Sequence, residues 1–416
     1  MNTALVRNPN NDLTSSNLFV KLALFVLWPF GAFLVSLFRP GSKSSYVIYF
    51  LFGMVFSWSM YYKGEEIDFN NLVLRFYMQD EMTFSQLFER MSNIFSYNSE
   101  DKDVYNLLLN WITQQFTQNF HALFVIASIP FSYFMLKSLA LITDDPKAYK
   151  QTFFVYVILL LFIVPKDIFN VQNFRFSTAT WVAVYSVSCY YLKKNKKVLL
   201  LLFLTPLIHS SFWFVVILYI GYLLFNRFYH PNLFYVSIPF AIISTGILNN
   251  IDISILPDTL SKWASGYVSD EAQRKWGMNA EGSGFRWVQD AFTYFRIIIY
   301  SIAIIIILKS EELNKTIPQN KRIFNFHIYF LTIVYFCQSI PVLGSRFLGI
   351  SQIVTILLWF KIIFPKHQRI LLLMLLSWTH ELLYAGIKHY SMVIDGDFFF
   401  LNLFSLISKY WGIVNY

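Results

Sequence analysis

The pattern of apolar residues constrains this chain more than any other feature. Long apolar runs follow one another from end to end, and most could cross a hydrocarbon core of about 30 Å as a helix. They cover residues 18–38, 45–62, 119–142, 150–165, 173–192, 198–226, 233–250, 287–308, 323–341, 346–364 and 369–386, with a shorter apolar tail at 398–412. Only 14% of the residues are charged, compared with about 25% in soluble domains. We therefore predict an all-α, polytopic integral membrane protein with about 12–13 transmembrane or re-entrant helices.

Two long polar connections interrupt this series, at residues 63–118 and 251–285. The first contains amphipathic pieces such as the segment 84–90 and is expected to form interfacial helices. The second carries tryptophans and several glycines and is expected to be a surface loop. No internal repeat or separate soluble domain is evident, so residues 1–416 are predicted to form a single membrane-embedded domain.

Basic residues in the short connections predict the orientation. The lysine cluster at 193–197 and the basic connection at 309–322 are both expected in the cytoplasm, which places the two long connections outside. This holds only if the run 198–226 contributes two crossings or a re-entrant hairpin. As one helix it would be about 43 Å long, so we predict a broken pair with Pro206 and His209 at the bend. The net charge of +9 lies in these connections and does not indicate nucleic-acid binding.

Three arginines are expected at the outer ends of their spans. Arg175 lies about 27 Å along its helix from the lysine cluster, and Arg346 and Arg286 each open another span. Arginine carries a permanent charge and a planar fork of donors, so this set predicts an anionic phosphate ligand approached from outside. The alternative for each arginine alone is an interfacial anchor that reaches lipid headgroups.

Further polar residues accompany these arginines. Asn173 precedes Arg175, and Ser210 follows His209, whose alternative role is that of a core histidine satisfied by a hydrogen bond. Asp68, in the first long connection, could pair with an arginine or act as a base, or could be a solvated loop acid.

No metal site is predicted. Asp395-Gly396-Asp397 has the Asp-x-Asp form of some metal-dependent glycosyltransferases, but it also suits a turn before a helix. His380-Glu381 lacks the second histidine of a zinc-protease motif.

The central segment resembles the signature of the EpsG-like, Wzy-type polysaccharide polymerases. The resemblance rests on Asn173-x-Arg175-Phe176-x-x-Ala179, a lysine-rich turn, and the segment 207–212 around His209. Looser similarities are Gly64 to Asp68-Phe69, and Gly344-Ser345-Arg346-Phe347. Phe69 and Phe176 depart from the Tyr and Gln found in many members.

The resemblance implies a membrane glycosyltransferase without a cofactor or metal, in the bacterial cytoplasmic (inner) membrane. Its substrates would be a polyprenyl-diphosphate-linked glycan donor and a lipid-linked acceptor, joined on the outer face to build an O-antigen, capsule or exopolysaccharide. Arg175, Arg346, Arg286, Asn173 and Ser210 would bind the diphosphate, and His209 or Asp68 would take the acceptor proton, with Arg175 in the catalytic set. Possible partners are the lipid bilayer and a chain-length regulator protein.

Two other classes of membrane protein remain open on the same features. A flippase or transporter of lipid-linked oligosaccharide has a similar size and a basic cavity, although many transporters have two related halves. A membrane O-acyltransferase or a ligase of surface glycan would also use a buried histidine or an outer arginine.

Overall fold

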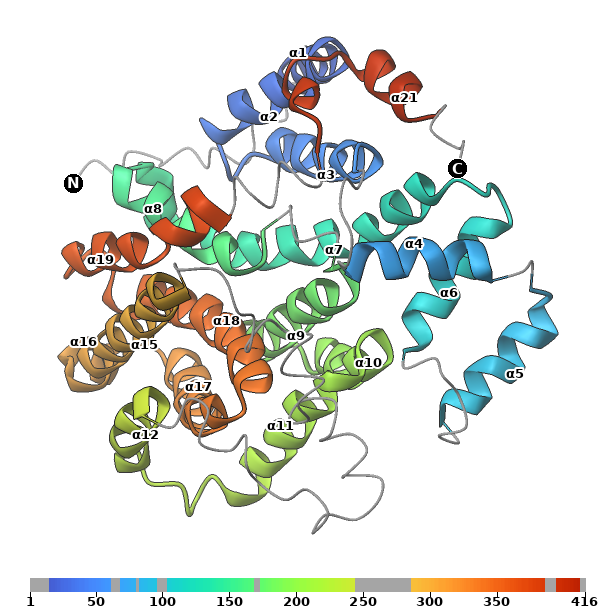
Figure 1. The fold of residues 1–416 in the computed structure, drawn as a ribbon. Helices are drawn as coiled ribbons and strands as arrows, with labels where there is room; N and C mark the ends of the chain where they lie inside the picture. Colours follow the sequence, from blue (N-terminus) through green and yellow to red (C-terminus); the bar gives the residue numbers. More distant parts are fainter. Residues whose placement is uncertain are drawn as a thin grey trace. The chain divides into compact units, whose positions relative to one another are not determined.

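The computed structural model describes residues 15–60, 68–79, 82–95, 103–167, 173–243, 286–385 and 394–411. Within these ranges the secondary structure is helical, and the only β pairing is an isolated antiparallel bridge between Met60 and Ile394 (Figure 1). Three helical segments in the described part are long and apolar enough to cross a membrane, at Phe120–Thr143, Asp290–Lys309 and Leu343–Ile363. The predicted all-α, polytopic membrane fold is confirmed.

Every predicted apolar run contains helix. The α-helices are α1 (Ser15–Leu27), α2 (Pro29–Leu37), α3 (Lys43–Trp58), α4 (Asp68–Met78), α5 (Phe84–Phe95), α6 (Val104–Gln114), α7 (Phe120–Thr143), α8 (Phe153–Ile163), α9 (Phe174–Lys193), α10 (Leu200–Ile208), α11 (Trp213–Phe225), α12 (Asn232–Ile243), α15 (Arg286–Lys309), α16 (Glu311–Lys315), α17 (Pro318–Phe336), α18 (Pro341–Leu358), α19 (Arg369–Ser377) and α21 (Leu403–Trp411).

Some predicted spans are interrupted or begin elsewhere. The run 18–38 is divided into α1 and α2 because Pro29 starts a new helix after Trp28, whose φ of −159° and ψ of 87° are not helical. The run 369–386 is divided into α19 and a π-helical turn at Glu381–Ala385. Helix α18 begins at Pro341 and not at Arg346, because proline suits the first helical turn. Arg346 therefore lies within the helix and does not open it.

The predicted break in the run 198–226 is confirmed. Helix α10 ends at Ile208, and His209 has an extended backbone with φ −151° and ψ 119°. A 3₁₀ turn at Ser210–Phe212 then leads into α11. Pro206 lies in the last turn of α10, where its missing amide removes one helical hydrogen bond.

The described residues form two compact units, and each is described by itself. The first comprises residues 1–155, 166–215 and 384–416, and the second residues 156–165 and 216–383. The predicted single domain over 1–416 stays a prediction.

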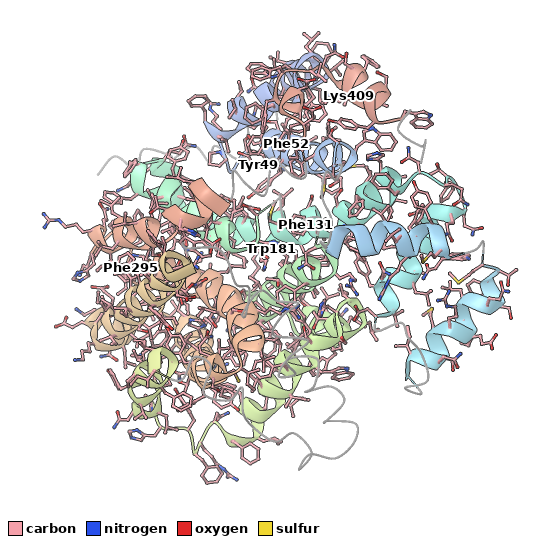
Figure 2. All side chains as sticks on the ribbon, in the orientation of Figure 1. Tyr49, Phe52, Phe131, Trp181, Phe295 and Lys409 are labelled. Carbon is pink, nitrogen blue, oxygen red and sulfur yellow. The ribbon has the colours of Figure 1, made fainter. Side chains whose placement is uncertain are left out.

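In the first unit, α7 packs against α3 and α9, and α9 packs against α10. Small residues allow these close contacts, since Ser177, Thr178, Ala179 and Thr180 of α9 are all buried. Phe131 and Trp181, labelled in Figure 2, are fully buried in α7 and α9. Helix α9 is therefore enclosed along most of its length, which fixes the position of its first turn.

The connection 63–118 contributes α4, α5 and α6 to the same unit (Figure 1). Gln114 of α6 donates hydrogen bonds to the carbonyl oxygens of Phe76 and Gln79 at the end of α4. Leu87 of α5 and Leu107 of α6 share a small apolar cluster with Met82. Since α6 also packs against α7 and α10, the start of α6 is fixed next to the buried helices.

In the second unit, α17 packs against α12 and α18, while α15 packs against α12, α18 and α19. His327 of α17 is buried, and its Nε2 lies 2.8 Å from the hydroxyl of Thr355 of α18. The hydroxyls of Ser301 and Tyr335 are 2.8 Å apart and join α15 to α17. These polar side chains are thus paired across neighbouring helices, as expected where water is excluded.

Candidate functional site

The site begins at the first turn of α9. Asn173 is the N-cap residue of this helix, although its side chain makes no capping hydrogen bond, and Arg175 is the second helical residue. Nη1 of Arg175 donates to Oδ2 of Asp103 at 2.6 Å. The Asp103 side chain is 2% exposed and the Arg175 side chain 20% exposed. The ion pair is thus buried on the carboxylate side, while the Arg175 side chain is partly accessible.

Asp103 also binds the chain at the break after α10. Its second oxygen, Oδ1, accepts the backbone N–H of Ser210 at 2.6 Å. One carboxylate at the start of α6 thus connects α9 with the turn that follows His209. Residues far apart in the sequence are held together by two short, charge-assisted hydrogen bonds.

Two effects act in opposite directions on the Asp103 carboxyl, which lies in the connection 63–118, outside the predicted spans. Burial raises its pKa above the usual range, whereas the Arg175 guanidinium and the Ser210 N–H lower it. Burial is the larger of the two effects, because this side chain is almost completely removed from solvent.

His209 is oriented by the residues around it. Nδ1 accepts the backbone N–H of Ser211 at 3.2 Å and lies 2.8 Å from the Ser211 hydroxyl. The ring meets Phe176 of α9 edge to face, with 5.3 Å between centroids. When Nδ1 accepts the amide, a neutral imidazole carries its proton on Nε2. The ring therefore presents Nε2–H as a hydrogen-bond donor.

Lys166 adds a second positive charge. Its Nζ lies 5.1 Å from the centroid of Phe176, and its carbonyl oxygen accepts the indole N–H of Trp181 at 2.9 Å. Phe176 thus contacts both Lys166 and His209. With Arg175 and Lys166 against Asp103, the formal charge of this cluster is positive before His209 is counted, which suits an anionic ligand.

The structure brings together only part of the predicted site. Arg175, Asn173, His209 and Ser210 lie in the first unit, around Asp103. Arg346 is half-buried in α18 of the second unit. Asp68 and Arg286 are the first residues of α4 and α15, and their side chains lie outside the described residues, as does the connection 251–285. The roles predicted for Arg346, Asp68 and Arg286 stay predictions.

Sequence reasoning missed Asp103 and Lys166. Asp103 directly precedes an apolar helix, which is a common place for an N-cap residue, and Lys166 follows Pro165 at the end of a predicted span. Both positions have an ordinary structural explanation. Their proximity to Arg175 and Phe176 becomes visible only in three dimensions.

The Asp-x-Asp segment is engaged by a lysine. Nζ of Lys409, on α21 (Figure 2), lies 2.7 Å from Oδ2 of Asp395 and 2.9 Å from Oδ2 of Asp397. An ammonium group therefore lies between the two carboxylates that a metal ion would need. Among the described residues, no group of three or more His, Cys, Asp or Glu side chains has an arrangement suited to a metal.

Comparison with protein families, curated proteins and solved structures gives a match to a family. No curated protein and no solved structure matches the chain. The sequence profile of the EpsG family matches residues 72–392, which include Asp103, Arg175, His209 and Arg346. Because this match covers most of the sequence, the chain belongs to the EpsG family.

Proposed function

We propose that this protein is a polysaccharide polymerase, a membrane glycosyltransferase that joins polyprenyl-diphosphate-linked repeat units on the outer face of the bacterial cytoplasmic membrane. One observation carries the proposal: Asp103 holds Arg175 and the turn after His209 together at one end of buried helices. Membership of the EpsG family supports the same class of reaction.

The charge of the cluster suits the donor substrate. In the proposed reaction the bond between the anomeric carbon and the diphosphate oxygen breaks, and the electron pair leaves with the diphosphate. The partly accessible side chain of Arg175 and the ammonium of Lys166 would stabilise this developing charge. Arg346, Arg286, Asn173 and the hydroxyl of Ser210 are further candidates for contacts with the diphosphate. This arrangement of cations requires no metal ion.

The acceptor must lose a proton as its oxygen bonds to the anomeric carbon. His209 and Asp68 are the candidates for the base. Because Nδ1 of His209 accepts the Ser211 amide, the geometry favours His209 as a donor from Nε2–H to a diphosphate oxygen. Asp68 is then the better candidate for the base. The reaction depends mainly on holding donor and acceptor together, since the diphosphate is already a good leaving group.

The proposal is tested by replacing Arg175 and analysing the surface glycan. We expect Arg175→Ala to leave the amount of protein in the membrane unchanged and to limit the exported glycan to one repeat unit. Arg175→Lys should also be defective, because a single ammonium group cannot replace the two-pronged contact of a guanidinium. Lys321→Ala, in the first turn of α17, is the control and should give normal chain lengths.

Three results would contradict the proposal. Normal chain length in Arg175→Ala excludes diphosphate binding by this residue. Accumulation of lipid-linked units on the cytoplasmic side indicates a flippase, and accumulation of finished polymer that is not attached to its final acceptor indicates a ligase.

A further inference from the structure

The second unit contains a partly buried ion pair that the proposed reaction does not use. Nη2 of Arg296, on α15, lies 2.9 Å from Oε1 of Glu381 and 3.3 Å from the Thr293 hydroxyl. The guanidinium lies 4.4 Å from the ring centroid of Trp378, whose indole N–H donates to the hydroxyl of Tyr300 at 3.1 Å. Arg296 is thus held on several sides and is only 7% exposed.

Both partners lie well inside their predicted spans. Arg296 is 13 residues from Lys309 at the basic end of α15, which corresponds to about 20 Å. Glu381 follows α19, which starts at the basic Arg369 and ends at Ser377. Because Glu381 is ion-paired with Arg296, it lies at a similar depth, and the spacing of Arg296 places the pair within the predicted hydrocarbon core. Ionisable side chains at that depth are costly and usually have a function.

The pair has an accessible side. The Glu381 side chain is 32% exposed, compared with 9% for Arg296. Glu381 begins the π-helical turn that follows α19, and such turns often occur at functional sites. An exposed carboxylate at this depth is costly against lipid, which favours a polar space next to its second oxygen, the one that Arg296 does not contact and that is here called the open oxygen. Next to it, the rings of Phe292 and His380 are stacked with 5.8 Å between centroids.

The chemistry of this surface suits a neutral ligand rich in hydroxyl groups. Arg296 and Glu381 cancel each other's charge, in contrast to the positive cluster around Arg175. Glu381 offers an acceptor, while the buried guanidinium of Arg296 holds this carboxylate in place. The stacked rings of Phe292 and His380 add a flat apolar surface. A fixed carboxylate next to aromatic rings matches the polar edge and apolar face of a sugar ring.

We propose that Glu381, Arg296 and the Phe292–His380 stack form a binding site for a neutral saccharide ring of the glycan substrate. This inference rests on the proposed polymerase function. In that reaction the site would hold a sugar residue of the donor or acceptor through the open oxygen of Glu381, while Arg296 positions the carboxylate.

The test measures glycan binding to the purified full-length chain by isothermal titration calorimetry. The probes are fragments of one to three repeat units, prepared by mild acid hydrolysis of the surface glycan of the source cells. We expect Glu381→Gln and Phe292→Leu each to weaken binding at least tenfold. Phe292→Leu removes the ring and leaves both charged residues in place. Glu312→Gln is the matched control, because Glu312 forms an ion pair with Lys366 elsewhere in the same unit. This variant should bind the glycan fragments as tightly as the unmodified protein.

A second pair of measurements separates ligand binding from a purely structural role. The exchange Arg296→Glu/Glu381→Arg keeps an ion pair but moves the carboxylate to the other helix. Binding of the glycan fragments should therefore remain lost, even if the unfolding temperature is higher than in Glu381→Gln. Unchanged binding in Glu381→Gln or Phe292→Leu, or recovery of binding in the exchanged variant, would overturn the proposal. Competition of inorganic pyrophosphate with the fragments in the Arg175→Ala variant would also overturn it, because the site would then accept an anion.

Failure of this inference differs from failure of the proposed function. If Arg175→Ala stops polymerisation while Glu381→Gln binds fragments and polymerises normally, only the saccharide site is wrong. If Arg175→Ala makes polymer of normal length, the proposed function is wrong, whatever the fragments show.

Discussion

Asp103 is the residue on which the geometry of the first unit depends most. Its Oδ2 accepts a hydrogen bond from the Arg175 guanidinium, and its Oδ1 accepts one from the backbone N–H of Ser210. We predict that Asp103→Asn lowers the free energy of unfolding by about 1.5–3 kcal/mol, the value of a hydrogen bond to a charged group. Polymer length should fall as well, because Arg175 loses the contact that orients it. Thermal unfolding of the purified protein and glycan analysis measure the two effects.

The control for Asp103→Asn is a substitution in a solvent-exposed ion pair. Glu311→Gln removes the partner of Lys315, and both of these side chains are exposed. Exposed pairs of this spacing contribute about 0.3–0.5 kcal/mol, so the unfolding temperature should hardly change. An equal effect of the two substitutions would show that Asp103 does not have the structural role inferred from its burial.

His209 is predicted to act through the proton on Nε2. Glutamine can place an amide N–H near the same position, whereas alanine cannot. We therefore expect His209→Gln to keep more polymerase activity than His209→Ala, measured with purified lipid-linked units. Equal and complete loss in the two variants would favour His209 as the base, because an amide cannot accept the proton.

The sequence identified the polar residues that stand out against apolar surroundings. Arg175 and His209 could be recognised because charge is costly within an apolar run. Asp103 could not, since it ends the polar segment Ser99-Glu100-Asp101-Lys102-Asp103, in which any acid could be solvated. Arg296 was hidden for a different reason: its partner Glu381 is 85 residues away, and nothing in the sequence indicates their contact.

At the level of elements, Gly344 determines how α18 begins. A Cβ atom at this position would lie 2.6 Å from Cα of Gln338 and 2.7 Å from the carbonyl oxygen of Cys337. Both are backbone atoms and cannot turn away. We predict that Gly344→Ala costs about 1–3 kcal/mol, as overpacking usually does, and displaces the turn that carries Arg346. Thermal unfolding and polymer length measure the result.

Gly349 of the same helix is the matched control. A Cβ atom there would meet Cβ of Pro165 at 3.7 Å, which is an ordinary contact. Alanine is favoured over glycine within helices by about 1 kcal/mol, so Gly349→Ala should be neutral or stabilising. Destabilisation of the same size at both positions would mean that the close approach at Gly344 is not the cause.

Apolar length predicted the helices well and their interruptions less well. The break at His209 was predictable because 29 residues exceed one crossing and Pro206 is unsuited to a helix interior. The π-helical turn at Glu381 was not, because the residues of Glu381–Ala385 carry no proline or glycine. Tertiary contacts of α15 with α19 accompany that irregularity and leave no local pattern in the sequence.

At the level of the whole molecule, the orientation in the membrane follows from charge and from the number of crossings. Lysines at 193–197 and the basic connection at 309–322 belong on the same side only if the broken run 198–226 contributes two crossings or a re-entrant hairpin. The observed interruption at His209 is compatible with either. The proposed reaction needs the lysines 193–197 in the cytoplasm, which places Arg175 on the outer face, and it needs the double crossing or hairpin to bring Arg286 and Arg346 to the same face.

We predict the sides of the membrane for three exposed positions. In a background with Cys189→Ser and Cys337→Ser, Ser85→Cys on α5 should react in intact cells with a maleimide that does not cross membranes. Asn195→Cys and Asn314→Cys should react only after the membrane is opened. If Asn314→Cys reacts in intact cells while Asn195→Cys does not, the run 198–226 crosses once, and the positive charges at 309–322 lie outside. If Asn195→Cys also reacts in intact cells, Arg175 faces the cytoplasm, where a polymerase of exported glycan cannot use it.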